Sequence, residues 1–195
     1  MPHDQKTGMI DRHHLNGHRS LVIWFTGLSG SGRSTLANML ERYLQEREIH
    51  TFILDGDHVG KGLNRDLDFS DAGRNENIRC VGEVAKLMME AGLVVIAAFI
   101  SPFREKRRQL RTLLGKETFV EVFVDTPIEI CEKRDTKGLY RKARMREIAH
   151  FTGISSPYEY PENPDIRIDS SRETPEESIS KIISFIWPNL GYRKS

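Results

Sequence analysis

One glycine-rich segment constrains the fold of this chain more than any other feature. Residues 27–35 read GLSGSGRST and lie between a short apolar run, 21–25, and a helix-like pattern at 33–47. The apolar run predicts a buried strand, and the apolar spacing after the loop predicts a helix. In such a strand–loop–helix unit the glycines let backbone N–H groups face inward, and the helix dipole favours anions. The segment therefore predicts a phosphate-binding loop rather than a merely flexible Gly/Ser linker.

Two side chains at the end of this loop bear on its chemistry. Arg33 stands where a phosphate-binding loop usually has lysine, and Ser34 is placed to offer its hydroxyl to Mg²⁺. Arginine keeps the positive charge and can bind phosphate through two N–H groups, but its guanidinium is larger and planar. We expect nucleotide binding to survive this change, and transfer to be slower.

The rest of the chain alternates between strand and helix patterns. Further strands are expected at 51–54, 93–100, 119–124 and 166–168. Further helices are expected around 78–88, ended by Gly92, at 104–114, from Pro127 onward, and at 174–186. Apolar strands alternating with helices predict an α/β fold with a parallel sheet covered on both faces. Such sheets bind ligands at the carboxyl ends of their strands.

Length and charge narrow the class of protein. The 195 residues suggest about one domain, and we expect a polar tail at 1–19 followed by a single domain at 20–195. With a formal net charge of +1, nothing suggests a nucleic-acid partner. The longest apolar run, 93–100, is too short to cross a bilayer, so we expect no membrane association.

The cysteines and the N-terminal histidines give weaker signals. Cys80 and Cys131 lack the spacing of metal ligands. They suggest reduced thiols in a cytoplasmic protein, with a single disulfide between them as the alternative. His13, His14 and His18 are expected to be solvated residues of a tail or surface strap, with metal binding as the less favoured alternative.

Polar residues follow two of the expected strands. Asp55 and Asp57 flank a glycine after the second strand, where carboxylates can orient Mg²⁺ or accept a proton from an attacking hydroxyl. Asp57 is the preferred base. Ser101 follows the third strand and either contacts an acceptor or caps the next helix.

Two other segments carry cations. Arg74, Asn77 and Arg79 can hold anionic groups, and Phe69 can stack on a base. The basic segment at about 134–155 has the composition of a mobile lid over transferring phosphates. Solvated charges on helix surfaces are the alternative for both segments.

Taken together, these residues resemble the adenylylsulfate kinase family in order over about residues 18–165. The resemblance is carried by residues 27–35, Asp55-Gly56-Asp57, Phe69-Ser70 with Arg74, Glu76-Asn77-Ile78-Arg79, Phe99-Ile100-Ser101-Pro102, Val124-Asp125-Thr126-Pro127, Cys131-Glu132-Lys133-Arg134-Asp135, Lys137-Gly138-Leu139-Tyr140 and Phe151-Thr152-Gly153-Ile154. The loop alone would indicate only P-loop proteins, whereas the joint set is specific.

The resemblance implies a P-loop kinase with a five-stranded parallel sheet between helices and a basic lid. It implies phosphorylation of adenosine 5′-phosphosulfate (APS) by ATP with Mg²⁺, in cytoplasmic sulfate assimilation, by a protein that is often a homodimer. It implies ATP contacts at Gly27, Leu28, Ser29, Gly30, Ser31, Gly32, Arg33, Ser34, Thr35, Cys131 and Arg134, with Ser34 on the metal. It implies APS contacts at Asp55, Asp57, Phe69, Arg74, Asn77, Ile100, Ser101, Lys137, Leu139, Phe151 and Thr152. Catalytic roles fall to Asp57, Arg33, Ser101 and Lys137, and Ser101 matches a serine described in the family as a phosphoserine.

This chain departs from the family pattern at two positions. Arg33 replaces the loop lysine, and Gly60, followed by Lys61, stands where the family usually has a substrate-holding arginine. Two alternatives therefore stay open: a kinase of another nucleotide-like acceptor, and a nucleotide-binding regulatory protein with weakened turnover.

Overall fold

The fold is built on one parallel sheet. The computed structural model describes residues 8–68, 70–135 and 137–191. Five strands lie in the order β2-β3-β1-β4-β5, and every neighbouring pair is parallel. The strands are β1 (Val22–Thr26), β2 (Thr51–Asp55), β3 (Val94–Ala98), β4 (Phe119–Asp125) and β5 (Ile166–Asp169). The predicted five-stranded α/β fold is confirmed.

The register of the central strands brings their carboxyl ends to one edge. Phe25 of β1 and Asp55 of β2 both pair with Ala98 of β3, so the loops that follow these strands start side by side. Every residue of β1 and β3 is buried. Burial on both faces explains why these strands read as continuous apolar runs rather than alternating ones.

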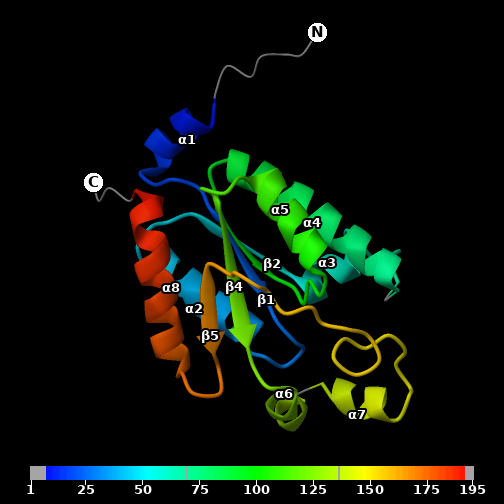
Figure 1. Ribbon diagram of the computed structural model, residues 1–195. Helices are drawn as coiled ribbons and strands as arrows, with labels where there is room; N and C mark the ends of the chain where they lie inside the picture. Colours follow the sequence, from blue (N-terminus) through cyan, green and yellow to red (C-terminus); the bar gives the residue numbers. More distant parts are fainter. Residues whose placement is uncertain (1–7, 69, 136, 192–195) are drawn as a thin grey trace.

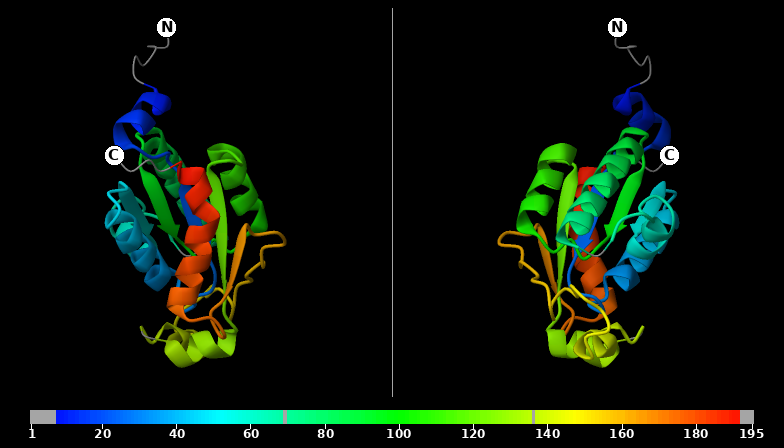
Figure 2. Two further views of the ribbon diagram at one scale, coloured as in Figure 1. Left: turned by 90° about the vertical axis from the view of Figure 1, so that its left-hand side faces the viewer. Right: turned by 90° about the vertical axis from the view of Figure 1, so that its right-hand side faces the viewer.

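Helices cover both faces of the sheet (Figures 1 and 2). On one face, α2 (Arg33–Gln45) and α8 (Pro175–Leu190) share a core with alternate residues of β1, β3 and β4. On the other face, α4 (Asp71–Glu90) and α5 (Arg104–Leu114) pack around Trp24. The buried side chains of α4 recur at helical spacing, which is why the sequence revealed this helix.

A smaller layer lies at the carboxyl ends of the strands. It contains α6 (Ile128–Arg134) and α7 (Leu139–Arg144) and continues through a loop to the start of β5. Figure 1 shows it at the bottom of the molecule, across the end of the sheet. It packs on the domain through its own apolar cluster, which includes Leu28, Tyr140, Phe151 and Tyr158. Residues 134–155 of this layer are the segment predicted as a basic lid, and here it contacts the loop that follows β1.

Two further short helices, like α7, were not expected from the sequence. The first is α3 (Gly56–Lys61), which follows β2 directly. The second is α1 (Met9–Asn16), in the segment expected to be a tail or strap. None of the residues of α1 is buried, and Asn16 Nδ2 donates to the Gly92 carbonyl at 3.0 Å. Within the described residues, no helix is long and apolar enough to cross a membrane.

Of His13, His14 and His18, only His14 is exposed as expected, and the other two correct the expectation of solvated side chains. His18 is 1% exposed, and its Nε2 accepts the backbone N–H of His50 at 3.1 Å. His13 Nε2 accepts the N–H of Ser20 at 3.0 Å. The error arose because these contacts depend on the start of β1 and on the residue before β2, which local composition does not reveal.

Candidate active site

The loop after β1 has the backbone shape of a phosphate cradle. Gly27 has φ 152°, and a Cβ placed there would lie 2.7 Å from the Val124 carbonyl oxygen. Gly30 has φ 74°, and its Cβ would lie 3.1 Å from the Cys131 carbonyl oxygen. Side chains are therefore strained or excluded at both positions, and the glycines let the loop pack closely against the backbone of β4 and α6.

Two polar atoms inside this cradle lack partners. Ser31 Oγ and Arg33 Nε are both buried, and neither has a hydrogen-bond partner within the part of the chain that the structure describes. Burial lowers the pKa of Arg33, while Tyr158 and Asp55 act in the opposite direction. Arg33 is half-buried as a residue, but its buried Nε and the Ser31 hydroxyl are costly without an anion, so these residues fit a phosphate group.

The outer side of the loop is held by β4 and the lid. Thr126 Oγ1 donates to the Ser31 carbonyl at 3.0 Å, and Arg134 Nη1 donates to the same oxygen at 3.2 Å. Tyr140 donates its hydroxyl to the Ser29 carbonyl at 2.9 Å. These contacts fix the loop through its carbonyl groups, and within the loop the Ser31 N–H donates to the Leu28 carbonyl at 3.1 Å. Thr126 and Tyr140 were missed as site residues, although Thr126 lies two residues after a predicted strand.

Cys131 and Arg134 were predicted to contact ATP. Cys131 has a free, buried thiol, and its backbone lies against Gly30. Burial raises the pKa of this thiol. Arg134 is exposed and reaches both the loop and the Ser170 carbonyl, at 3.1 Å. Its nucleotide contact stays a prediction, whereas its support of the loop is visible.

A pair of oxygen ligands suited to Mg²⁺ lies at the start of α2. Ser34 Oγ donates to Asp55 Oδ2 at 2.8 Å, which joins the phosphate loop to the carboxyl end of β2. Mg²⁺ prefers such hard oxygen ligands and is commonly bound through one or two of them together with substrate phosphates. Thr35 is exposed on the first turn of the same helix.

The predicted acceptor residues on α4 meet the lid. Arg74 donates to Thr152 Oγ1 and to the His150 carbonyl, and its burial lowers its pKa. Phe151, between these partners, packs edge-on against Tyr140 with 5.0 Å between ring centroids. One turn further along α4, Asn77 Oδ1 accepts from Asn64 at 2.7 Å. The structure thus brings Arg74, Phe151 and Thr152 together.

Other predicted positions are placed less fully. Lys137 is exposed in the turn before α7, Leu139 begins that helix, and Ile100 is half-buried after β3. Asp57 lies in α3, but its side chain is outside the described part of the structure, and Phe69 is outside the described residues altogether. Their roles stay predictions.

Ser101 lies in a buried environment. The residue is 1% exposed with φ 41°, and Trp24 Nε1 donates to its hydroxyl at 3.1 Å. The hydroxyl is therefore shielded in this conformation, and phosphorylation of it would require the loop to open. Its catalytic role stays a prediction.

These features define a class of protein. A P-loop kinase contains a phosphate loop after the first strand, with a serine at the end of that loop. It also contains an aspartate at the end of another strand and a lid over the strand ends.

The comparisons with known proteins then give the family. The chain belongs to the adenylylsulphate kinase family, whose model matches residues 19–169. An adenylyl-sulfate kinase from Marinobacter nauticus is 54% identical over 184 residues, which cover 94% of this chain and 92% of that protein. One from Oceanobacillus iheyensis is 52% identical, covering 93% of this chain and 92% of that protein.

A solved structure agrees with this assignment. The Mycobacterium tuberculosis APS kinase CysC in complex with AMPPNP and APS has a TM-score of 0.83 and 46% identity, covering 87% of this chain and 98% of that one. The resemblance noted from the motifs is confirmed, and the chain is a nucleotide-binding kinase.

Proposed function

We propose that this chain transfers the γ-phosphoryl group of ATP to the 3′-hydroxyl of APS, which yields 3′-phosphoadenylylsulfate and ADP. The observation that carries this proposal is the hydrogen bond between Ser34 and Asp55, since it joins the phosphate loop to the strand end expected to face the acceptor. The adenylyl-sulfate kinases named above, about half identical to this chain, support the same reaction.

The nucleotide half of the site needs little beyond the backbone. Residues 27–35 hold the ATP phosphates, and Arg33 provides the buried positive charge next to them. Ser34 and Asp55 are the residues that hold Mg²⁺, which supplies neutralisation of phosphate charge when bound. Arg33 reduces the rate relative to lysine because its planar head fits the compact lysine position poorly.

The acceptor half positions APS and its hydroxyl. Arg74 and the lid residues Phe151 and Thr152 form one wall, with Asn77 along the same helix. Asp57 takes the proton as the 3′-oxygen forms its bond to the γ-phosphorus, and the bond to the β-phosphate oxygen breaks with its electron pair leaving on ADP. Direct in-line transfer needs only positioning and charge stabilisation, so no phosphoserine at Ser101 is required.

The assembly and the compartment are part of the proposal. We expect a homodimer in the cytoplasm; both cysteines are free thiols, in keeping with a reducing compartment. A hexameric APS kinase from Thiobacillus denitrificans is 28% identical with a TM-score of 0.69, and this chain covers 32% of that protein. Sedimentation with and without ATP would establish the assembly of this chain.

A coupled ADP-release assay tests the reaction. APS is offered beside AMP, cytidine nucleotides and shikimate-like alcohols, and APS is expected to be phosphorylated fastest. A faster rival acceptor would refute the substrate and leave the kinase class intact. Calorimetry with a non-hydrolysable ATP analogue and Mg²⁺ separates binding from turnover: heat without ADP release would indicate a regulatory nucleotide-binding protein.

A further inference from the structure

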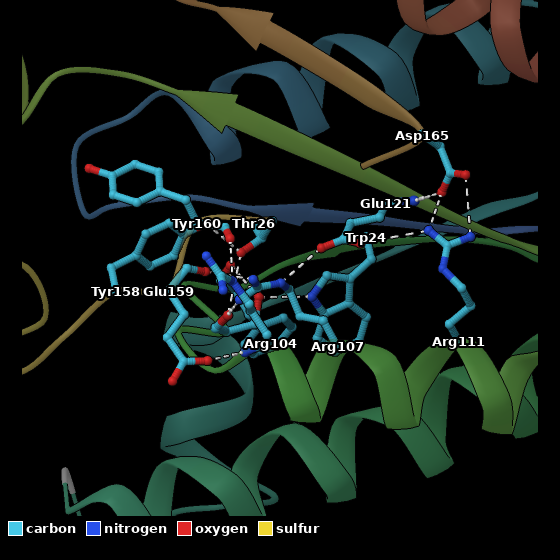
Figure 3. Close-up of polar contacts among 12 residues, drawn as sticks. Trp24, Thr26, Arg104, Arg107, Arg111, Glu121, Tyr158, Glu159, Tyr160 and Asp165 are labelled. Carbon is cyan, nitrogen blue, oxygen red and sulfur yellow. Dashed lines mark hydrogen bonds and ion pairs between the residues drawn. The ribbon is translucent and has the colours of Figure 1, made fainter. Parts of the chain in front are cut away.

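Arg107 is a buried cation that the reaction described so far does not use. It lies on α5 within a helix expected to be merely charged, yet only 3% of its surface is exposed. Its guanidinium does not face solvent. It points between the loop after β3 and the segment after the lid (Figure 3).

The guanidinium contacts three separate segments. Nη1 donates to the Ser101 carbonyl at 2.5 Å, and Nη2 donates to the Glu159 carbonyl at 2.6 Å. Nε lies 2.8 Å from Glu121 Oε1 on β4 and forms an ion pair with it. The geometry of this pair does not meet the criteria for a hydrogen bond. The planar guanidinium can contact partners in three directions at once. A lysine ammonium on a flexible side chain does not reproduce this arrangement.

The first carbonyl belongs to the predicted acceptor loop. Ser101 has φ 41°, a left-handed backbone conformation that is unfavourable for a residue with a side chain. Arg107 holds its carbonyl, and Trp24 holds its hydroxyl from the strand that leads into the phosphate loop. The orientation of Ser101 is therefore set from α5 and β1, and the neighbouring Ile100 carbonyl accepts from Thr26 Oγ1 of β1 at 2.7 Å.

The second carbonyl belongs to the segment that follows the lid. Glu159 comes directly after Tyr158, whose ring centroid lies 5.8 Å from the Arg107 guanidinium carbon. The Tyr158 hydroxyl lies 2.9 Å from Thr26 Oγ1, one residue before Gly27. Burial raises the pKa of Tyr158 to about 12, so this hydroxyl stays protonated. Arg107 thus connects the end of the lid with the loop after β3.

We propose that Arg107 is a positioning residue for the acceptor: it fixes the loop of Ile100 and Ser101 relative to the lid, and so determines how well APS is held. This inference rests on the proposed function. It assigns Arg107 no contact with APS and no part in the chemical step. Loss of its two carbonyl contacts should weaken APS binding and leave ATP binding unchanged, because the phosphate loop is supported by Thr126, Arg134 and Tyr140.

The charge of Arg107 complicates a simple truncation. Burial raises the pKa of Glu121, while Arg107 and Arg111 oppose that shift. Removing Arg107 alone leaves a buried carboxylate short of a partner, which lowers stability whatever Arg107 does for APS. The test therefore needs one variant that keeps the charge and another that removes both members of the pair.

The experiment compares three variants with the parent protein. Arg107→Lys keeps a cation beside Glu121 but loses the planar guanidinium. Arg107→Met with Glu121→Gln removes both charges together. Arg108→Lys is the matched control, because Arg108 is exposed on the same helix and pairs only with Glu105 among the described residues. Each is measured for the KM of APS, the KM of ATP, kcat and thermal stability.

The expected result is that the KM of APS rises while the KM of ATP does not change. Arg107→Lys and the double variant each raise the KM of APS about tenfold, as expected for a lost charged hydrogen bond, with the KM of ATP unchanged. Arg108→Lys changes neither constant. The inference is overturned if the KM of APS stays at the parent value in both Arg107 variants, or if both KM values rise together in step with lost stability. If the parent itself does not phosphorylate APS, the proposed function fails and this inference falls with it, which the parent assay alone reveals.

Discussion

The two halves of the site are built in different ways. The phosphate loop is contiguous in sequence, and its shape comes from backbone conformation at residues such as Gly27 and Gly30. The proposed acceptor half draws on α3, α4, the loop after β3 and the lid, and side-chain contacts join α4 to the lid and hold the loop after β3. The phosphate loop can be predicted from a short motif. The acceptor half forms only when segments that are distant in sequence come together in the fold. Each half also carries one departure from the family pattern, Arg33 in the first and Gly60 in the second.

The largest effect is expected in the nucleotide half. Arg33→Lys should raise kcat by ~10²–10³, the usual range for a group that stabilises transition-state charge. The reason is that a compact ammonium suits the lysine position, whereas the buried guanidinium has an unpartnered Nε. Steady-state ADP release measures kcat, and the KM of APS should not change.

The control for this change is Arg33→Met, which shortens and neutralises the side chain and should lower kcat. If Arg33→Lys leaves the rate unchanged or reduces it, the loop has adapted to arginine and the first departure is not a defect.

The next effect is expected in the acceptor half. A Cβ at Gly60 would meet nothing within 4 Å, so Gly60→Arg has room for its side chain. The added cation should lower the KM of APS roughly ten- to a hundredfold, equivalent to one charged hydrogen bond of about 1.5–3 kcal/mol. Lys61→Ala should raise the KM of APS if Lys61 now compensates for the missing arginine.

Gly62→Arg is the matched control, since it adds the same charge two positions away on the same segment. Equal tightening by both arginines would mean that a general increase in positive charge, not a specific contact, attracts the substrate. A change in the KM of ATP would contradict the separation of the two halves.

A smaller effect is expected where the halves touch. Tyr140→Phe removes the hydrogen bond from the lid to the Ser29 carbonyl but keeps the ring contact with Phe151. A neutral hydrogen bond is worth about 0.5–1.5 kcal/mol, so the Kd of the ATP analogue should rise roughly two- to tenfold. Calorimetry with an ATP analogue checks this, with Tyr160→Phe on an exposed ring as the control. A larger change in the KM of APS would show that the lid serves mainly the acceptor.

The smallest effect lies outside both halves, at the histidines around α1. Burial lowers the pKa of His13, assisted by His18, Arg19 and His14, and burial lowers the pKa of His18, assisted by His50 and opposed by the Arg19 carbonyl. Both are depressed below the unfolded value of about 6.5, so the unfolded chain binds protons more readily. The stability that these two histidines contribute as neutral side chains is therefore fully present above about pH 6.5. That contribution is lost as the pH falls below this value.

Urea unfolding from about pH 5 to about pH 8 tests this dependence, since histidine titrates in that range. His18→Gln should flatten the curve without changing either KM at neutral pH. An unchanged slope in that variant would mean that other groups cause the pH dependence.

The sequence predicts the frame of the fold well because each strand and long helix carries its own apolar pattern. The short helices α3 and α7 were not predicted because six residues, with two glycines in α3 and three charged side chains in α7, show no clear periodicity. The helix α1 escaped because it buries none of its residues. These elements are set by what surrounds them rather than by their own sequence.

The same contrast holds within the site. Gly27 and Ser34 were predicted from spacing alone, because the motif encodes their geometry. The burial of Ser101 was not predictable, since it depends on Trp24, 77 residues away, and on Arg107 from the next helix. The contact of Arg74 with Thr152 likewise joins residues 78 apart. Contacts of this kind leave no local signal.

The buried thiol of Cys131 gives the lid a built-in reporter. Cys131 packs with Tyr140 and Phe151 and is wholly shielded from solvent. A thiol reagent can reach it only when this cluster separates, so in a Cys80→Ser background the rate of labelling tests whether the predicted lid opens. Ligands that favour the closed lid should slow the labelling, whether or not they are turned over. A single chemical measurement of this chain therefore follows lid motion independently of catalysis.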